Sequence, residues 1–416
     1  MGEISGTSRA GTIPPSCLHE VFRAAEDRER ATGRPVVKLH VGEPYFPPPR
    51  EVALAVAHAV HQGRTAYTSA EGMPALREAL AVKLETENGH RTSPDRVFVT
   101  PGSCQGLAAL FQSLANRGDE LLLPELHWPI HLQQVLLAGF RPVFYALGPG
   151  YRPRLDAIRA ALTPRTRAVL INSPANPTGA VLGTELMEGI LELAREHDLQ
   201  IISDEAYEHF VYEGEHVSFA SLEHGLPERE RRVFSTFTFS KSLAMTGYRL
   251  GYVVTPNAVA AHALRVVQEA SIIGPSTPVQ YAGLTALKAR DSARENARMV
   301  LANRDRALPA LREAGLLGEL PQGGWYAVLD LDPVGVDADT FAAGLLEKYD
   351  VGVAPAAGFA LRPVLSDDGR ILCADPAPDS RRLLRLAFCG DPAELDTGVE
   401  RLLAHAADLR SRGGDP

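Results

Sequence analysis

One lysine in a hydroxyl-rich segment is the residue of this sequence best placed for covalent chemistry. Lys241 follows the apolar run at 233–238, within the segment Ser-Thr-Phe-Thr-Phe-Ser-Lys-Ser, and Arg249 stands eight residues further on. The whole chain contains only five lysines. A partly neutral amine in this position can form a Schiff base with a carbonyl compound. Taken alone, however, a surface lysine after a strand is the simpler interpretation.

Two upstream segments also end apolar runs with polar side chains. Asp204 and Tyr207 follow the run at 200–203, and Asn176 stands in the turn Asn-Pro-Thr-Gly after the run at 168–172. Ligands of open α/β sheets bind beyond the carboxyl ends of the strands. We therefore expect Asn176, Asp204 and Lys241 to converge on one crevice. A turn asparagine or a helix-capping aspartate is the alternative for either residue taken singly.

The elements that must position these residues alternate along the middle of the chain. Short apolar runs that read as strands are separated by stretches with helical spacing of apolar residues. This alternation predicts an α/β fold with a mostly parallel sheet that helices cover on both faces. The expected strands lie at 97–100, 120–123, 142–146, 168–172, 200–203, 233–238 and 250–255, and helices at 103–115, 184–197 and 258–270.

The two ends of the chain are expected to form a second unit. A polar helix at 16–32 and a short strand at 36–41 precede a proline-rich loop, and a long helix at 290–314 precedes further strands. We expect an N-terminal arm at 1–49 that contributes to the small domain, a large domain at 50–292 and a C-terminal small domain at 293–416. The Asp-, Pro- and Arg-rich stretch at 362–381 reads as a surface excursion.

Composition excludes several classes of protein. The chain has 416 residues, 45% of them hydrophobic, and a net charge of −9, which argues against nucleic acid as a partner. No window approaches the roughly 20 apolar residues that span a bilayer, and no apolar signal region stands near the start. Four widely spaced cysteines form no metal motif or disulfide framework, so we expect no metal site and a cytoplasmic location.

Together, the motifs resemble the class I/II aminotransferases, fold-type-I enzymes that use pyridoxal 5′-phosphate (PLP). The matching order is N-P-T-G, D-E-A-Y, S-K and T-G-Y-R-L-G, and the likeness runs from about residue 14 to 403. It implies a mostly parallel seven-stranded sheet flanked by helices, with a smaller α+β domain built from both ends of the chain.

The resemblance also assigns cofactor residues. Lys241 resembles the lysine that holds PLP as an internal aldimine and shuttles the α-proton. Asp204 matches the acid that keeps the pyridine nitrogen protonated. Tyr207 and Asn176 match the pair that hydrogen-bond the 3′-oxygen of the ring. Arg249 looks like the phosphate clamp of the family.

The remaining cofactor contacts are implied around the phosphate and the ring. Backbone N–H groups of Gly102, Ser103 and Cys104 at a helix start suit an anion. Cys104 departs from the commoner residues there, and we interpret its side chain as a small buried hydrophobe without chemistry. The remaining implied contacts are the hydroxyls of Thr238 and Ser240, the stacking ring of Trp128, and Tyr67, which reaches the partner's phosphate in a homodimer.

The substrate contacts implied are Gly42, through its backbone, and Arg385, as the bidentate partner of the α-carboxylate. Arg381 and Arg382 are the alternatives if the register differs, although an arginine inside an apolar strand needs a partner, which favours Arg385. The side-chain pocket is expected near residues 13–17, at the loop after Gly42 and near residues 272–278. His127 and His131 flank Trp128, and we interpret both as surface residues. The identity of the substrate does not follow.

The implied reaction is ping-pong transfer of the amino group of an L-amino acid to a 2-oxo acid. A PLP-dependent oxidase, lyase or cyclase of specialised biosynthesis on the same scaffold is the alternative. An effector domain of a transcription regulator is disfavoured, because the roughly forty residues before Gly42 leave no room for a winged helix. A Rossmann dehydrogenase is disfavoured because no G-x-G-x-x-G opens a helix.

Overall fold

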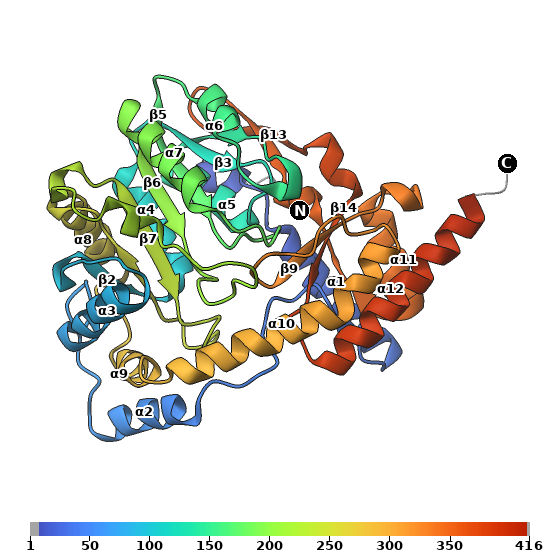
Figure 1. Ribbon diagram of the computed structural model, residues 1–416, viewed down its shortest axis with the longest axis horizontal. Helices are drawn as coiled ribbons and strands as arrows, with labels where there is room; N and C mark the ends of the chain where they lie inside the picture. The colour runs from blue at the N-terminus through green and yellow to red at the C-terminus, as the bar shows by residue number, and fades with distance from the viewer. Residues whose placement is uncertain (1–7, 414–416) are drawn as a thin grey trace.

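A computed structural model describes residues 8–413 of the chain, so residues 1–7 of the expected arm and 414–416 of the expected C-terminal domain lie outside it. Seven strands between residues 97 and 254 form the central sheet in the order β2-β8-β7-β6-β5-β3-β4 (Figure 1). Within this range β8 alone runs in the direction opposite to the other six strands. The strands are β2 (Val97–Thr100), β3 (Glu120–Pro124), β4 (Arg141–Tyr145), β5 (Thr166–Asn172), β6 (Gln200–Asp204), β7 (Val233–Thr238) and β8 (Gly251–Val254).

Helices cover both faces of this sheet because its strands are apolar on both sides. Successive residues of a strand point to opposite faces, so Leu121 and Leu123 of β3 pack on one layer of helices and Leu122 on the other. The first layer contains α4 (Gly102–Leu114) and α5 (Pro129–Ala138), and the second contains α6 (Leu155–Ala161) and α7 (Thr184–Glu196). A sheet buried in this way needs continuous hydrophobic strands, which is the pattern that the sequence carries.

Five further helices complete the large unit and connect it to the rest. Helix α8 packs against α4, while α2 and α9 pack together at the outer margin of the molecule (Figure 1). The long helix α10 then runs from beside α9 to the C-terminal helices of the chain (Figure 1). The bounds are α2 (Arg50–His61), α3 (Pro74–Glu87), α8 (Ala258–Ile272), α9 (Thr277–Ala286) and α10 (Arg290–Glu313).

Both ends of the described chain build the smaller unit. Within residues 326–387, β11, β14 and β9 form an antiparallel sheet, and helices α11 and α12 pack around it with α10. The N-terminal arm joins this unit because β1 pairs in parallel with β10. The bounds are α1 (Cys17–Thr32), β1 (Val37–Lys38), β9 (Tyr326–Asp330), α11 (Ala338–Tyr349), β10 (Val351–Gly352), β11 (Ala354–Pro355), β14 (Leu383–Ala387) and α12 (Pro392–Gly413).

The stretch expected as a surface excursion contains an ordered β-hairpin. Strands β12 (Leu361–Leu365) and β13 (Ile371–Pro376) pair antiparallel. Ile371 N donates a hydrogen bond to Thr12 Oγ1 over 3.1 Å, and the inward side chains of Leu361, Leu365 and Ile371 pack against the α4–α5 core. The hairpin therefore holds the N-terminal segment against the large unit.

The predicted fold class is confirmed, and each predicted strand of the large sheet overlaps an observed one. The predicted strand at 36–41 pairs as a strand only at 37–38, because the carbonyls of Leu39 and His40 bind the backbone N–H of Ala387 and the guanidinium of Arg385 instead. The division into domains at 49/50 and 292/293 stays a prediction. No helix within residues 8–413 is both long and apolar enough to cross a membrane.

Candidate active site

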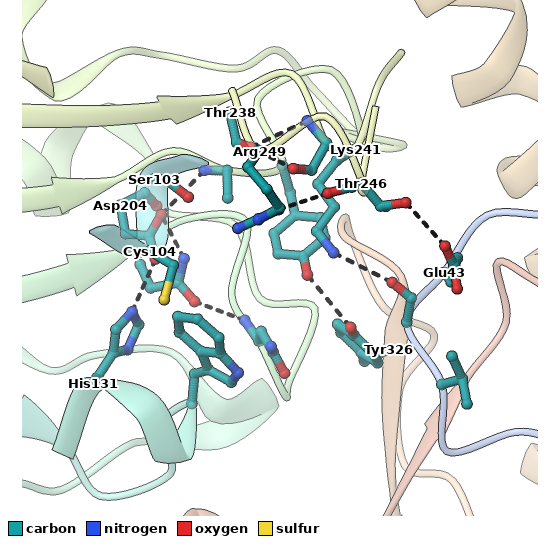
Figure 2. Close-up of a pocket in the computed structure, with 18 of the residues that line it drawn as sticks. Glu43, Ser103, Cys104, His131, Asp204, Thr238, Lys241, Thr246, Arg249 and Tyr326 are labelled. Atoms are coloured by element: carbon teal, nitrogen blue, oxygen red, sulfur yellow. Dashed lines mark hydrogen bonds and ion pairs between the residues drawn. The ribbon is translucent and has the colours of Figure 1, made fainter. Parts of the chain in front are cut away.

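A cavity of about 390 Å³ lies between the carboxyl edge of the large sheet and the N-terminal arm (Figure 2). Strands β5, β6 and β7 all end at it, as expected for a parallel sheet. The cavity brings together eleven of the residues that the sequence singles out: Gly42, Ser103, Cys104, Trp128, Asn176, Asp204, Tyr207, Thr238, Ser240, Lys241 and Arg249.

Lys241 stands in the turn that follows β7, and its amine faces the cavity. Nζ donates a hydrogen bond to Gly42 O over 3.3 Å. It also lies 4.7 Å from the ring centroid of Trp325, against which a cation is stabilised electrostatically. The amine thus has one weak hydrogen bond and an aromatic wall, and it is directed toward the space that the other polar side chains surround.

Asp204 ends β6 and is only 4% exposed. Its Oδ2 lies 2.9 Å from His131 Nε2, while Oδ1 accepts weaker bonds from Ala206 N at 3.3 Å and Thr236 Oγ1 at 3.4 Å. An ionised carboxylate only accepts hydrogen bonds, so Nε2 of His131 carries the proton when Asp204 is charged. A buried charge with these partners suits a cationic ligand atom in the cavity. Figure 2 shows the two side chains pointing toward each other.

The first turn of α4 forms an anion-binding cradle with Arg249. The residue before the helix is Pro101, and no side chain of the described residues caps the helix start, so its first N–H groups lack intrahelical partners. A Cβ added at Gly102 would lie 2.7 Å from Arg249 Nη2, and one added at Gly251 would lie 2.5 Å from Ser103 N. These glycines leave room for a guanidinium beside free N–H groups, which suits a phosphate.

Two hydroxyls extend this cradle and one thiol borders it. Thr238 Oγ1 and Ser240 Oγ lie 2.9 Å apart on the cavity side. Cys104 Sγ accepts a hydrogen bond from Gln134 Nε2 at 3.3 Å, and burial raises the pKa of this thiol. A thiol kept protonated by burial fits the interpretation of Cys104 as a residue without chemistry of its own.

Tyr207 and Asn176 present a phenol and an amide to the cavity. Burial raises the pKa of Tyr207 well above its usual value, and the neighbouring Tyr326 raises it further. The side chain is therefore a neutral phenol with a proton to donate. Asn176 Oδ1 accepts from Arg385 Nη1 over 3.3 Å, which leaves the NH₂ group of Asn176 for an acceptor in the cavity.

Arg385 lies behind the cavity wall and is 2% exposed. Its Nη2 donates to His40 O over 2.7 Å, and the rings of Tyr326 and Phe359 cover its guanidinium. Nε has no hydrogen-bond partner within residues 8–413. A buried, partly unsatisfied guanidinium suits a carboxylate ligand. Of the alternatives, Arg382 pairs with Asp330 Oδ1 at 2.9 Å on the surface and Arg381 is exposed.

Two aromatic residues take different positions. Trp128 lines the cavity, and its ring meets the His131 ring edge-on at 5.2 Å. Tyr67 is 86% exposed and lies outside this cavity. Nothing within one described chain places Tyr67 at the site, so its predicted contact requires a second subunit.

The interpretation of His127 and His131 as surface residues is wrong, because both are 1% exposed. His127 Nδ1 lies 3.2 Å from Pro124 O, and burial lowers its pKa to about 3, so the ring is neutral. His131 faces Asp204. The apolar neighbours of His131 in the sequence could have indicated that this residue is buried in α5. A buried histidine needs a polar partner, so a contact with a polar group of the site could have been expected.

Tyr326 and Phe22 also line the cavity and were not predicted. Tyr326 opens β9, and Phe22 lies on α1 of the N-terminal arm. Aromatic residues at these positions read as ordinary core residues from sequence, so only the folded arrangement assigns them to the site.

The described residues offer no metal centre, since no three His, Cys, Asp or Glu side chains of residues 8–413 group as one. The four cysteines, all within the described part, are unpaired.

Comparison with known proteins agrees with this geometry. The profile of the family "Aminotransferase class I and II" matches residues 34–402. An aspartate/prephenate aminotransferase of Thermus thermophilus is 38% identical over 358 residues, 85% of this chain and 91% of the relative. An arginine–pyruvate transaminase of Pseudomonas aeruginosa is 35% identical, covering 86% of this chain and 90% of its own. The structure of T. thermophilus aspartate aminotransferase with maleate superposes with a TM-score of 0.85 at 34% identity, over 96% of this chain and 99% of that one.

The fold and the cavity define a fold-type-I PLP-dependent enzyme. The chain belongs to the class I and II aminotransferase family, and it is a PLP-dependent aminotransferase that takes an amino acid and a 2-oxo acid as substrates. The residues present fit the cofactor: the uncapped helix start with Arg249 suits its phosphate, and the buried carboxylate of Asp204 suits its ring nitrogen. The oxidase, lyase or cyclase alternative is not favoured.

Proposed function

We propose that the enzyme moves the amino group of an L-amino acid to a 2-oxo acid in a ping-pong cycle in which Lys241 is the residue that handles protons. Bound PLP supplies an aldehyde that takes up the amino group and a protonated ring that accepts electrons. The observation that carries the proposal is the convergence of Lys241, Asp204, Tyr207 and Arg249 on a single cavity.

Four contacts hold and orient the cofactor in this proposal. Ser103 and Cys104 N–H groups, with Arg249 and the hydroxyls of Thr238 and Ser240, bind the phosphate. Asp204 keeps the ring nitrogen charged, and the buried His131 holds that carboxylate in place. Tyr207 and the NH₂ group of Asn176 donate to the ring oxygen. Trp128 covers the ring.

Lys241 and Arg385 act on the substrate. Arg385 binds the α-carboxylate through donors that the fold leaves free, which orients the Cα–H bond toward Lys241. Nζ of Lys241 takes the proton from Cα and would deliver it to the former aldehyde carbon of the cofactor, on the far side of the amino nitrogen. The weak 3.3 Å bond from Nζ to Gly42 O leaves the amine free to swing between these positions.

A homodimer completes the site. Tyr67 is exposed, and the neighbouring loop at 272–277 carries Ile273, which is 61% exposed. Thr277 Oγ1 donates to Ala66 O over 2.6 Å, so the two loops form one surface with apolar groups facing outward. We propose that this surface docks on a second copy and that Tyr67 reaches the partner's phosphate. A cytoplasmic location is kept as a prediction.

Mapping the cofactor on the chain tests the proposal. Borohydride fixes the cofactor to the lysine that binds it covalently, and peptide mass spectrometry then identifies that lysine. We expect the added mass on Lys241. Attachment to any of the other four lysines, or none at all in a protein that binds PLP, would contradict the assignment.

A further inference from the structure

Tyr326 lies beside Tyr207, Arg385 and Gly42, although its place in the sequence does not single it out. It opens β9, is 4% exposed and lines the cavity. Its hydroxyl lies 3.5 Å from the Tyr207 hydroxyl, which is the sole hydrogen bond of this group within residues 8–413. Figure 2 shows Tyr326 directed into the cavity opposite Lys241.

The ring of Tyr326 forms one wall of a slot that holds Arg385. The guanidinium carbon lies 4.2 Å from the Tyr326 ring centroid and 4.7 Å from that of Phe359. Two planar faces limit the tilt of the guanidinium, while His40 O and Asn176 Oδ1 limit its rotation. Aromatic rings packed against a guanidinium hold it in one orientation, in which its parallel N–H groups can bind both oxygens of a carboxylate.

The hydroxyl of Tyr326 lies so close to the backbone of residue 42 that any side chain there would collide with it. A Cβ at Gly42 would lie 1.7 Å from Tyr326 Oη, and Gly42 O accepts the hydrogen bond from Lys241 Nζ. The hydroxyl therefore lies where Gly42, Tyr207 and Lys241 meet, and position 42 has no side chain that would displace it.

We propose that Tyr326 is a positioning residue with two separable parts: its ring orients Arg385 for the substrate carboxylate, and its hydroxyl strengthens Tyr207 as a donor to the cofactor. This inference rests on the roles proposed above for Tyr207 and Arg385. In the structure Tyr207 donates this bond to Tyr326. When the Tyr207 proton is directed to the cofactor, the Tyr207 oxygen is free to accept, and Tyr326 can donate to it instead. Chained hydrogen bonds polarise one another.

Two substitutions separate the parts. Tyr326→Phe removes the hydroxyl and keeps the ring, and Tyr326→Leu removes both. The first readout is the pH midpoint of the visible absorption change of the substrate-free holoenzyme, which reports on the charge at the 3′-oxygen. Tyr207 without its donor holds that charge less well. We expect the midpoint to rise by roughly half a pH unit in both variants, the effect of one modest hydrogen bond.

The second readout is KM against kcat for an amino acid that bleaches the visible band. Tyr326→Phe should leave KM within about threefold of the wild type, and Tyr326→Leu should raise it roughly tenfold because Arg385 loses one aromatic wall. Equal KM values in the two variants would overturn the role of the ring. An unchanged midpoint in Tyr326→Phe would overturn the role of the hydroxyl.

Tyr207→Phe separates this inference from the proposed function beneath it. If Tyr207→Phe raises the midpoint and Tyr326→Phe does not, Tyr326 is not coupled to Tyr207. If neither substitution moves the midpoint, the proposed contact of Tyr207 with the cofactor is wrong. Cofactor content and circular dichroism establish that each variant is folded. If the leucine variant does not fold, the near-isosteric Tyr326→Phe variant still tests the role of the hydroxyl.

Discussion

His131 Nε2 lies 2.9 Å from Asp204 Oδ2, and both side chains are almost completely buried. The pair spans two layers of the fold, since His131 belongs to α5 and Asp204 ends β6. Asp204 has no lysine or arginine ion-pair partner among the described residues, so the histidine is the strongest donor that holds this carboxylate. The carboxylate of Asp204, which is proposed to face the cofactor, is therefore held by a residue of α5. The sequence of this helix is mostly apolar and does not indicate such a role.

His131→Phe should weaken the binding of the cofactor. The buried carboxylate loses its shortest hydrogen bond, and hydrogen bonds to charged groups are worth about 1.5–3 kcal/mol. We expect cofactor dissociation and the rate of the amino-acid half-reaction to worsen by roughly 10- to 100-fold. Dialysis and stopped-flow absorbance measure the two effects. Asp204→Asn should impair cofactor binding and the half-reaction rate more strongly than His131→Phe does. If His131→Phe shows wild-type values for both quantities, His131 does not contribute to the site.

The phosphate cradle can be tested by adding one methyl group. Gly102 has a φ of 75°, and its Cβ would lie 2.7 Å from Arg249 Nη2. Gly102→Ala should displace the guanidinium and raise the Kd for PLP at least roughly tenfold, as expected when a charge-assisted contact is lost.

A matched control for Gly102 exists in the chain. Gly225 has a φ of 86°, and nothing lies within 4 Å of its added Cβ. Gly225→Ala carries a similar backbone strain of about 1 kcal/mol without reaching the cradle, so its thermal midpoint should fall while the Kd for PLP stays unchanged. Similar Kd values for the two variants would count against the cradle.

Hybrid dimers test the proposed contribution of Tyr67 to the partner's site. Tyr67→Ala leaves both sites of a dimer without the partner's phenol, and Lys241→Ala leaves both without the amine. When the two inactive variants are unfolded, mixed and refolded, one site of each hybrid contains both groups. We expect activity to return, measured as 2-oxo acid formed. A mixture that stays inactive despite verified hybrid formation would place Tyr67 outside the partner's site.

A buried ion pair beside strand β7 should make stability depend on pH. Lys83 Nζ bonds to Asn88 Oδ1 at 2.8 Å and pairs closely with Glu208. Burial opposes the charge of Glu208, but Lys83 and its other neighbours outweigh burial and lower the pKa of Glu208 to about 2. The folded pKa is below the unfolded one, so this stabilisation is complete above about pH 4.5.

The stabilisation is expected to disappear as the pH falls from about 4.5 toward 2, and its size is roughly 3 kcal/mol. Lys83→Met should destabilise the fold by about 3–5 kcal/mol at neutral pH, because it removes the lysine that pairs with the buried carboxylate of Glu208. Urea unfolding at several pH values measures both. Glu29, a partly exposed carboxylate paired with Lys38 at 3.1 Å, is the control: Glu29→Gln should change stability by less than about 1 kcal/mol.

Sequence predicted those parts of the site that follow from local order along the chain. Asp204 ends a buried strand, Asn176 and Lys241 stand shortly after the ends of two others, and parallel strands bring their carboxyl ends to one edge. The strands themselves are apolar runs separated by helices, so the large sheet is predictable from pattern alone.

The residues that were missed depend on contacts between distant segments. His131 reaches Asp204 across 73 positions in the chain, and Tyr326 reaches Tyr207 across 119. Such pairs cannot be predicted from the spacing of residues along the chain. They form because α5 packs on the sheet and because β9 lies beside the N-terminal arm. The hairpin at 361–376 was likewise hidden by its polar composition, since its inner face carries few apolar residues.

The most direct test of amino-group transfer is the visible spectrum of the purified holoenzyme as single L-amino acids are added in air without a 2-oxo acid. Transamination predicts that a donor amino acid removes the visible band, that one equivalent of its 2-oxo acid is released per site, and that the band returns only after a 2-oxo acid is added. If the band instead recovers unaided while oxygen is consumed or ammonia is released, the enzyme is an oxidase or a lyase and the account is wrong.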